Sequence, residues 1–363
     1  MNYKKLDELL EYIQPTQYIV KSENYDDSFS TPVLTAGKSF ILGYTDETNG
    51  IYFASKENPI ILLDDFTTEC KLVDFAFKVK SSACKILKPK KDINIKYVYY
   101  AMKNIDIDTA LHKRYWISIY SQQTIPFPSP IIQENIVSEI EAIKETIEYN
   151  EHKIKCLEEL IKSQFIEMFN SETNLVKMKT LCQFINGDRG KNYPSAKDIV
   201  NCGIPFINAG HLNNNIIDFD EMNYITEEKY ELLSSGKIEE NDILYCLRGS
   251  LGKKAISRIS KGAIASSLLI LRPDTNKILP LFLLYSLEQE YIMEQMYKSN
   301  NGSSQPNLSA QSVKEYDLIL PELSKQIDFA DFVQQIDKSK FIVQKEIKLL
   351  EELLEVKMNE YFS

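Results

Sequence analysis

The sequence of 363 residues has few of the residues that build metal and redox sites. Its three histidines, His112, His152 and His211, are far apart, which argues against a metal cluster. Its six cysteines are scattered and form no Cys-x-x-Cys pair, a pattern typical of reduced thiols in the cytosol. We therefore expect no metal site and no disulfide framework, and we expect the chain to be cytoplasmic.

Long apolar runs are also lacking. No window of the sequence reaches the ~18 apolar residues that a membrane helix needs. Residues 1–10 are rich in Lys, Asp and Glu and no apolar run follows them, so we expect no signal peptide. A content of 44% hydrophobic and 26% charged residues is typical of a globular protein, and the length predicts two or three domains.

Two catalytic motifs are missing from the sequence. There is no Gly-rich phosphate loop of the Walker form, so we do not expect the chain to use ATP. The one Asn-Pro pair before Ile60 continues with two isoleucines, so it is not an Asn-Pro-Pro-Tyr methyltransferase motif. We expect no catalytic centre on this chain.

A nuclease site is the weaker interpretation of one acidic cluster. Asp64 or Asp65, with Glu69 and Lys71, has residue types that hold Mg²⁺ and activate water. The Asp-Asp-Phe sequence is better interpreted as a turn after a strand.

The net charge of −10 argues against nucleic acid at face value, because phosphate neutralisation requires basic residues. Half of this excess lies in residues 131–170, which have four Lys and nine Glu. The longer segments on either side are near neutral, which leaves room for local basic faces.

A repeat organises the chain. Residues 128–169 match residues 321–362 without a gap at an offset of 193, and the match is closest where KCLEELIKSQFIEMF lies over KLLEELLEVKMNEYF. Neither helical stretch contains Pro or Gly after its first residues. Both carry apolar residues at alternating spacings of four and three, which is the period of a coiled coil.

The seam positions of the two copies correspond one to one. They are Ile136, Ile140, Ile143, Ile147, Asn150, Ile154, Leu157, Ile161, Gln164 and Met168 in the first copy, and Phe329, Val333, Ile336, Lys340, Val343, Ile347, Leu350, Leu354, Lys357 and Tyr361 in the second. The narrow stripe favours a coiled coil between the two copies, with separate packing of each helix on its own domain as the alternative. An antiparallel pair fits a chain whose two halves are related by a pseudo-two-fold axis. The polar seam residues either fix the register or mark solvated ends.

The segments before the helices repeat more loosely, with offsets that grow from 172 to 184. STPVLTAGKSF resembles GIPFINAGHL, ENPIILL (57–63) resembles ENDILYC (240–246) at 183, and SACKILKP resembles SLLILRP at 184. Short apolar segments predict strands at 51–53, 60–63, 75–79, 86–87, 205–207, 243–247, 254–259 and 268–271, and helix-like runs follow at 97–102 and 281–287. The expected fold class is α+β, with two similar domains and two long helices.

The order of these features, present twice, resembles the specificity subunit of type I restriction–modification systems. Each half has an αβ unit, a proline-marked exit (FPSPIIQENI or ILPELSKQI) and a long helix, and TAG, NAG and NGSSQPNLS match as well. The resemblance covers essentially the whole chain. It implies target-recognition domains at 1–130 and 171–322 and spacer helices at 131–170 and 323–363. The first unit departs from the pattern, with HKRYWISIYSQQT in place of a counterpart of NGSSQPNLS.

The resemblance also implies the partners. Each αβ unit would read one half of a split, asymmetric site in double-stranded DNA, and the helices would fix the gap and dock two modification subunits. Separate restriction subunits with motor activity would cut the DNA. S-adenosylmethionine, Mg²⁺ and ATP would be bound by those partners and no cofactor by this chain, which would be non-catalytic and not bound to a membrane.

Two other functions fit the same features. The chain could be the recognition subunit of a combined cleaving and methylating, type II-like system. It could also be a protein-interaction scaffold whose αβ units no longer bind DNA.

Loop residues with hydrogen-bond donors, acceptors or aromatic faces are the candidate DNA contacts. In the first unit the densest group is His112, Lys113, Arg114, Tyr115 and Trp116, with the alternative that the two aromatic residues belong to the core.

Outside that group, loops in both units contain further candidates, and the polar loop at 300–305 is alternatively a flexible linker. They are Lys38 and Tyr44 beside TAG in the first unit, and Lys191, Asn192, His211, Arg248, Ser250, Asn300, Asn301 and Gln305 in the second. Arg248, in the Gly-punctuated turn LRGSLGKK, is the strongest candidate.

Overall fold

The computed structural model describes residues 2–35, 37, 39–108, 113–300 and 306–363. The chain divides into two compact units: Met1–His152 with Gln344–Ser363 (unit 1), and Lys153–Val343 (unit 2). Each unit contains sheets, helices and one section of each long helix, which confirms the α+β class. In the described part of the chain, no helix combines the length and the apolar character needed to cross a membrane.

Unit 1 is built on a four-stranded sheet, a second mixed sheet and a short strand pair. The first sheet has the order β2 (Leu10–Ile13), β9 (Cys84–Pro89), β6 (Ile60–Asp64) and β7 (Cys70–Val73). The second has the order β4 (Ile41–Thr45), β3 (Thr31–Leu34), β8 (Ala76–Val79) and β5 (Tyr52–Phe53), and the pair is β1 (Tyr3–Lys5) with β10 (Thr124–Pro126). Its helices are α1 (Leu6–Leu9), η1 (Pro15–Tyr18), α2 (Ile95–Lys103) and η2 (Tyr120–Gln122).

Unit 2 has the same plan. Its first sheet has the order β12 (Cys182–Asn186), β21 (Leu268–Pro273), β18 (Ile243–Cys246) and β19 (Lys254–Ile256). Its second has the order β13 (Ile199–Val200), β17 (Tyr224–Ile225), β14 (Ile204–Ile207) and β20 (Ala263–Ile264), and its pairs are β11 (Leu175–Lys177) with β22 (Asp317–Ile319) and β15 (Leu212–Asn213) with β16 (Ile216–Ile217). Its helices are η3 (Met178–Thr180), η4 (Ala196–Asp198), η5 (Ala209–His211), α4 (Glu227–Leu232), α5 (Pro280–Ser286), α6 (Glu290–Lys298) and α7 (Ala310–Lys314).

The repeated topology extends to strand direction. In both units the first sheet is antiparallel, and the second contains one parallel pair, β3 with β8 or β14 with β20. The two units therefore share one scaffold. Every strand expected from the sequence also overlaps an observed strand.

One detail of the sequence repeat is wrong. Strands β9 and β21 correspond at the expected offset of 184, but Ile61 pairs with Leu87 whereas Ile243 pairs with Leu271. The true offset between β6 and β18 is therefore 182 and not 183. Both strands are apolar on consecutive residues and buried on both faces, so no polar alternation fixes their register in the sequence.

The long helices α3 (Pro130–Phe169) and α8 (Leu323–Phe362) begin in the same way. The buried Gln133 donates from Nε2 to the carbonyl oxygen of Pro128, 2.8 Å away. The buried Gln326 donates in the same way to Pro321, 2.9 Å away. The exit proline and the glutamine five residues later thus form a repeated helix start.

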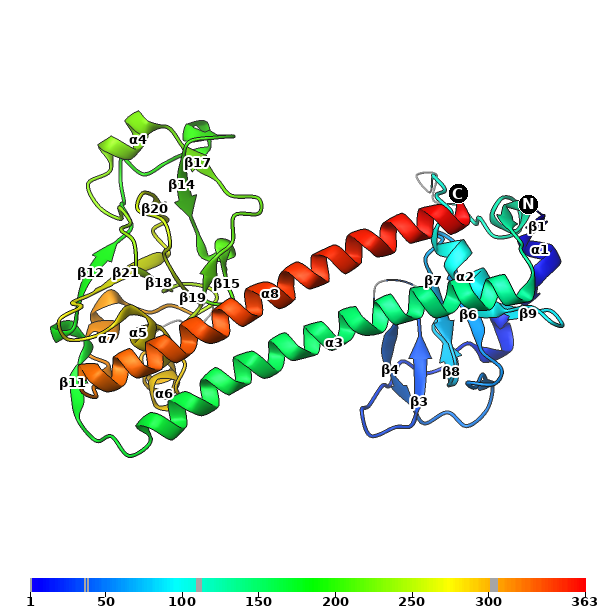
Figure 1. Cartoon of the computed structure of the whole chain (residues 1–363), viewed down its shortest axis with the longest axis horizontal. Coiled ribbons are helices and arrows are strands. Elements are labelled where there is room, and N and C mark those ends of the chain that lie inside the picture. The colour runs from blue at the N-terminus through cyan, green and yellow to red at the C-terminus, as the bar shows by residue number, and fades with distance from the viewer. Residues whose placement is uncertain (1, 36, 38, 109–112, 301–305) are drawn as a thin grey trace. The chain divides into compact units, whose positions relative to one another are not determined.

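The two helices pack against each other as an antiparallel coiled coil, which is evident in each unit separately (Figure 1). In unit 1, the start of α3 shares a core with the end of α8, since Ile140 and Phe362 lie in one cluster. In unit 2, the end of α3 meets the start of α8 in an aromatic cluster of Phe165, Phe169 and Phe329 with ring centroids 4.9–5.7 Å apart. All the predicted seam positions are buried or half-buried.

The two seam lysines make ion pairs between the helices. Lys340 Nζ lies 3.0 Å from Glu158 Oε1 in unit 2, and Lys357 Nζ lies 3.2 Å from Glu139 Oε1 in unit 1. Both seam lysines are therefore paired with a glutamate of the other helix. The polar seam residue Asn150 is buried.

Candidate nucleic-acid interface

In unit 1, Lys113 and Arg114 lie on the surface of a segment that docks onto the turn between β6 and β7. The amide of Tyr115 donates to the carbonyl oxygen of Asp65, 2.9 Å away. Arg114 donates from Nη2 to Ser82 Oγ at 3.2 Å, and both basic side chains are exposed. The docked backbone thus presents two cations to solvent.

Tyr115 and Trp116 need a correction as candidate base contacts. Their side chains are 1% and 3% exposed, and Trp116 packs in the main apolar core of unit 1 with Tyr120. The core alternative left open by the sequence is the one that the structure supports. The apolar rings act as the anchor from which Lys113 and Arg114 emerge.

Tyr44 lies on β4 and is half-buried, with its carbonyl accepting from the amide of Asp26 at 3.1 Å. The candidates Lys38, His112, Asn301 and Gln305 lie outside the described residues.

In unit 2, Arg248 and Ser250 are exposed in the turn between β18 and β19. Gly249 and Gly252 have φ angles of +80° and +75°, a region where a side chain would be strained, so the glycines permit this turn. The carbonyl of Arg248 accepts a hydrogen bond from Cys246 Sγ at 3.1 Å. The buried thiol of Cys246 therefore holds the backbone of the turn.

Three segments of unit 2 converge at this turn. Arg248 forms an isolated β-bridge with Asn307, and the amide of Asn307 donates to Asn300 Oδ1 at 3.0 Å. On the other side, Lys253 Nζ lies 3.4 Å from the carbonyl oxygen of Ala209. The structure thus brings the predicted Arg248 and Asn300 together.

Two exposed residues of this cluster, Lys253 and Asn307, were not among the predicted contacts. Lys253 stands within LRGSLGKK and Asn307 within NGSSQPNLS, so their position beside predicted contacts was the available signal.

His211 also needs a correction, because its ring is buried. Its Nδ1 accepts a hydrogen bond from the amide of Asn208 at 3.2 Å, while Asn208 Oδ1 accepts from the amide of Gly210 at 2.7 Å. These bonds close the NAG turn. In this structure His211 shapes the turn from inside and does not present its ring at the surface.

Lys191 and Asn192 follow a separate turn, where Gly190 has a φ of +94° and open space around it. Buried Asp188 holds this turn by accepting from the amide and hydroxyl of Ser234 at 2.7 and 2.9 Å. The hydrogen bond from the Ser234 amide is the largest reason that the pKa of Asp188 is lowered. Lys191 is exposed and Asn192 half-buried.

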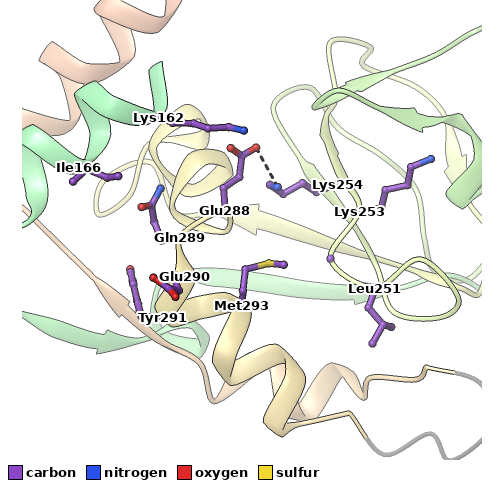
Figure 2. Close-up of a pocket in the computed structure, with 11 residues that line it drawn as sticks. Lys162, Ile166, Leu251, Lys253, Lys254, Glu288, Gln289, Glu290, Tyr291 and Met293 are labelled. Atoms are coloured by element: carbon purple, nitrogen blue, oxygen red, sulfur yellow. Dashed lines mark ion pairs between the residues drawn. The ribbon is translucent and has the colours of Figure 1, made fainter. Parts of the chain in front are cut away.

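A groove opens beside the Arg248 turn, between α3, the β18–β19 turn and the start of α6 (Figure 2). Lys254 pairs there with Glu288 at 3.3 Å, and Glu288 also accepts from Asn215 Nδ2 at 2.6 Å. Burial lowers the pKa of Lys254, and the carboxylate opposes that shift. Lys162 lies on the α3 side of the groove.

The acidic cluster of unit 1 does not have the geometry of a metal site. Asp64 Oδ1 accepts from the amides of Phe66 and Thr67, as in a turn after a strand, and Asp65 is paired with Lys85 at 3.2 Å. Within the described ranges, no group of three or more His, Cys, Asp or Glu side chains could hold a metal ion.

Comparison with known proteins gives consistent matches. The type I restriction modification DNA specificity domain matches residues 170–353. The specificity subunit of the type I restriction enzyme EcoR124I/EcoR124II from Escherichia coli is 38% identical over 293 residues, which cover 76% of this chain and 70% of that protein.

Two solved structures have the same fold. The S subunit of a type I restriction–modification system from M. genitalium aligns with a TM-score of 0.60 at 18% identity, covering 100% of this chain and 96% of that one. A chain from a structure concerning complex assembly and conformational transition of the type I system aligns with a TM-score of 0.58 at 14% identity, covering 99% and 97%.

Proposed function

Because the chain belongs to the specificity subunits of type I restriction–modification systems, we propose that it directs such a complex to a bipartite, asymmetric DNA site. Each unit reads one half of this site in double-stranded DNA. The recognition of two different half-sites is supported by the fact that the two units share one sheet topology but differ in their surface turns. A scaffold that keeps its core and varies its loops suits two different base sequences.

In unit 2 the reading surface is the cluster around Arg248. A guanidinium can bridge O6 and N7 of guanine, and a side-chain amide such as that of Asn300 suits adenine. Lys253 supplies a cation for a phosphate. The convergence of three chain segments on one exposed turn is the observation that carries this assignment.

In unit 1 the corresponding cations are Lys113 and Arg114. Both are exposed beside a backbone that is anchored in the core. They contact phosphates or base edges of the other half-site.

The helices dock two modification subunits and set the length of the unread gap. Residues 131–170 have an excess of Glu, which suits a surface that faces protein better than one that faces phosphate. Methyl transfer and cleavage are carried out by partner subunits, which bind S-adenosylmethionine, Mg²⁺ and ATP.

The test is to assemble the full chain with its modification subunits, map the methylated adenines in genomic DNA, and measure duplex binding across salt concentrations. A split motif with a fixed gap is expected. Alanine at Arg248 should relax the base requirement in one half-site, whereas alanine at Lys253 should reduce the salt slope by about one, as the loss of a phosphate cation does. A contiguous motif, or binding whose affinity, base requirement and salt slope are all unchanged by alanine at Arg248, Lys253 and Arg114, would instead indicate a scaffold.

A further inference from the structure

A buried ion pair lies beneath the docked segment of unit 1. Lys85 on β9 and Asp65 after β6 have side chains that are 3% and 2% exposed, and Lys85 Nζ lies 3.2 Å from Asp65 Oδ2. Lys85 also donates to the hydroxyl of Tyr12 at 3.2 Å. Both charges are removed from water, so each requires its partner.

The two carboxylate oxygens of Asp65 have different tasks. Oδ2 faces Lys85, whereas Oδ1 accepts the amide N–H of Trp116 at 2.8 Å. The carbonyl of Asp65 accepts the amide of Tyr115 at 2.9 Å. One residue thus fixes two consecutive peptide groups directly after Arg114.

Backbone hydrogen bonds identify the counterpart of Asp65 in unit 2. The amide of Asp65 donates to Ala83 at 3.0 Å, and the amide of Leu247 donates to Ser267 at 2.9 Å. The offsets of 182 and 184 are those of the surrounding strands. Leu247 therefore occupies the place of Asp65.

At this position a later segment of each unit docks through the same main-chain hydrogen bond. Tyr115 N donates to Asp65 O in unit 1, and Leu308 N donates to Leu247 O at 2.8 Å in unit 2. The same main-chain bond is formed with a buried leucine as with a buried aspartate.

Lys85 likewise has an apolar counterpart. Lys85 pairs with Leu63 across the sheet, and Leu269 pairs with Tyr245. Leu247 and Leu269 are both buried in the main core of unit 2. The scaffold therefore accepts an apolar pair where unit 1 has the ion pair.

Unit 2 forms the same scaffold without this ion pair, so the pair is not required for the fold. A buried ion pair is weak evidence for stability, because replacement of both partners by packed apolar residues is often neutral or stabilising. What a leucine cannot do is accept the N–H of Trp116. The carboxylate adds a directional constraint on the backbone that carries Lys113 and Arg114.

We propose that Asp65 and Lys85 are positioning residues for DNA recognition by unit 1: they hold the Lys113–Arg114 segment in its reading geometry. This inference rests on the proposed function. Pre-organisation of a contact segment raises affinity by reducing the ordering cost of binding. The pair acts through Arg114 and Lys113 and does not itself touch DNA.

The test is the double variant Asp65→Leu with Lys85→Leu, which copies unit 2. The full chain, assembled with its modification subunits, is titrated with duplexes that carry the site mapped by methylation and with duplexes changed in one half or the other. We expect about tenfold weaker binding and a loss of discrimination at the half-site of unit 1 only, with discrimination at the other half unchanged. Unfolding followed by the fluorescence of Trp116, the sole tryptophan, should show a melting temperature close to that of the parent, because the removal of two buried charges offsets the loss of the acceptor for the Trp116 N–H.

Unchanged affinity and discrimination in the double variant would overturn the proposal. So would equal losses at both half-sites, or a loss explained by a lower melting temperature of unit 1. A second variant, Lys113→Ala with Arg114→Ala, and its combination with the leucine pair complete a cycle, in which the losses should be less than additive. If the alanine pair has no effect while a split site is still read, the proposal fails and the proposed function stands; a complex that reads no split site contradicts the function itself.

Discussion

Unit 1 and unit 2 differ in where they carry a charge after the corresponding strands β6 and β18. The charge is buried in unit 1 and exposed in unit 2. In unit 1 the aspartate directly after β6, Asp65, is buried and the next residue, Phe66, is exposed. In unit 2 the counterpart Leu247 is buried and the next residue, Arg248, is exposed. The shared strand register determines which position faces inward, but it does not determine the chemistry there. An inward charge requires a buried partner, whereas an outward charge is free to contact DNA.

The largest expected effect follows from breaking the inward pair on one side. Asp65→Leu alone leaves Lys85 buried without its carboxylate and should cost about 3–5 kcal/mol. Urea unfolding monitored by Trp116 fluorescence measures unit 1 directly. The double leucine variant is the matched control and should recover most of the loss; a single variant as stable as the double would contradict the account.

The helix seam differs between the units in a similar way. Phe329 belongs to an aromatic cluster in unit 2, while its counterpart Ile136 is an aliphatic residue of the main core of unit 1. Phe329→Ala should lose about 3–5 kcal/mol, and Ile136→Ala about 2–5 kcal/mol because a smaller side chain is removed. Circular dichroism reports both transitions, and Trp116 fluorescence should shift only for the unit 1 variant.

An intermediate effect is expected at the Asp188 clamp, which unit 2 uses to hold the turn before Lys191. Asp188→Asn should lose about 1–3 kcal/mol, since charged hydrogen bonds to Ser234 are weakened. The pKa of Asp188 is lowered in the folded state. Its stabilisation is therefore fully present above the ordinary aspartate pKa of about 3.9 and is lost as the pH falls through the lowered value.

The pH dependence gives the check on that clamp. The difference in unfolding free energy between the parent and Asp188→Asn should be constant from about pH 7 to pH 5 and should shrink below about pH 3.9. A difference that grows on acidification would have the wrong sign.

The smallest effect is expected at the seam lysine of unit 2. Lys340 pairs with Glu158 while remaining partly exposed to water, so Lys340→Leu should change the unfolding free energy by less than about 1 kcal/mol. Thermal unfolding followed by circular dichroism is sufficient. A loss of several kcal/mol would mean that the pair has a structural role beyond register.

The sequence predicts the two long helices because their heptad period is strong, and it predicts eight of the 22 strands in the described residues because short apolar runs mark them. The two seams, 193 residues apart, carry enough apolar positions to predict that the helices pair, and the duplication of the whole unit predicts the antiparallel direction. The register of β6 against β18 was predicted one residue out because Ile60 to Leu63 is apolar throughout. A run buried on both faces contains no alternation from which a register can be inferred.

The candidate site was less predictable for a different reason. Loop composition correctly placed Arg248 in an exposed turn, but it could not distinguish the buried rings of Trp116 and His211 from surface ones. That distinction depends on contacts with distant residues, such as Asp65 with Trp116, 51 residues away. In the sequence, Lys85 likewise resembles an ordinary lysine on a strand, because its partner Asp65 lies in a distant segment.

Whether the two units read separate halves of one DNA site is decided by methylation mapping. Methylated adenines should be mapped for complexes assembled with the parent chain, with Arg114→Ala and with Arg248→Ala. Each substitution should relax or abolish the sequence requirement in a different half while the gap stays the same. Relaxation of the same half by both substitutions, or of neither half, would show that the units do not read separate half-sites.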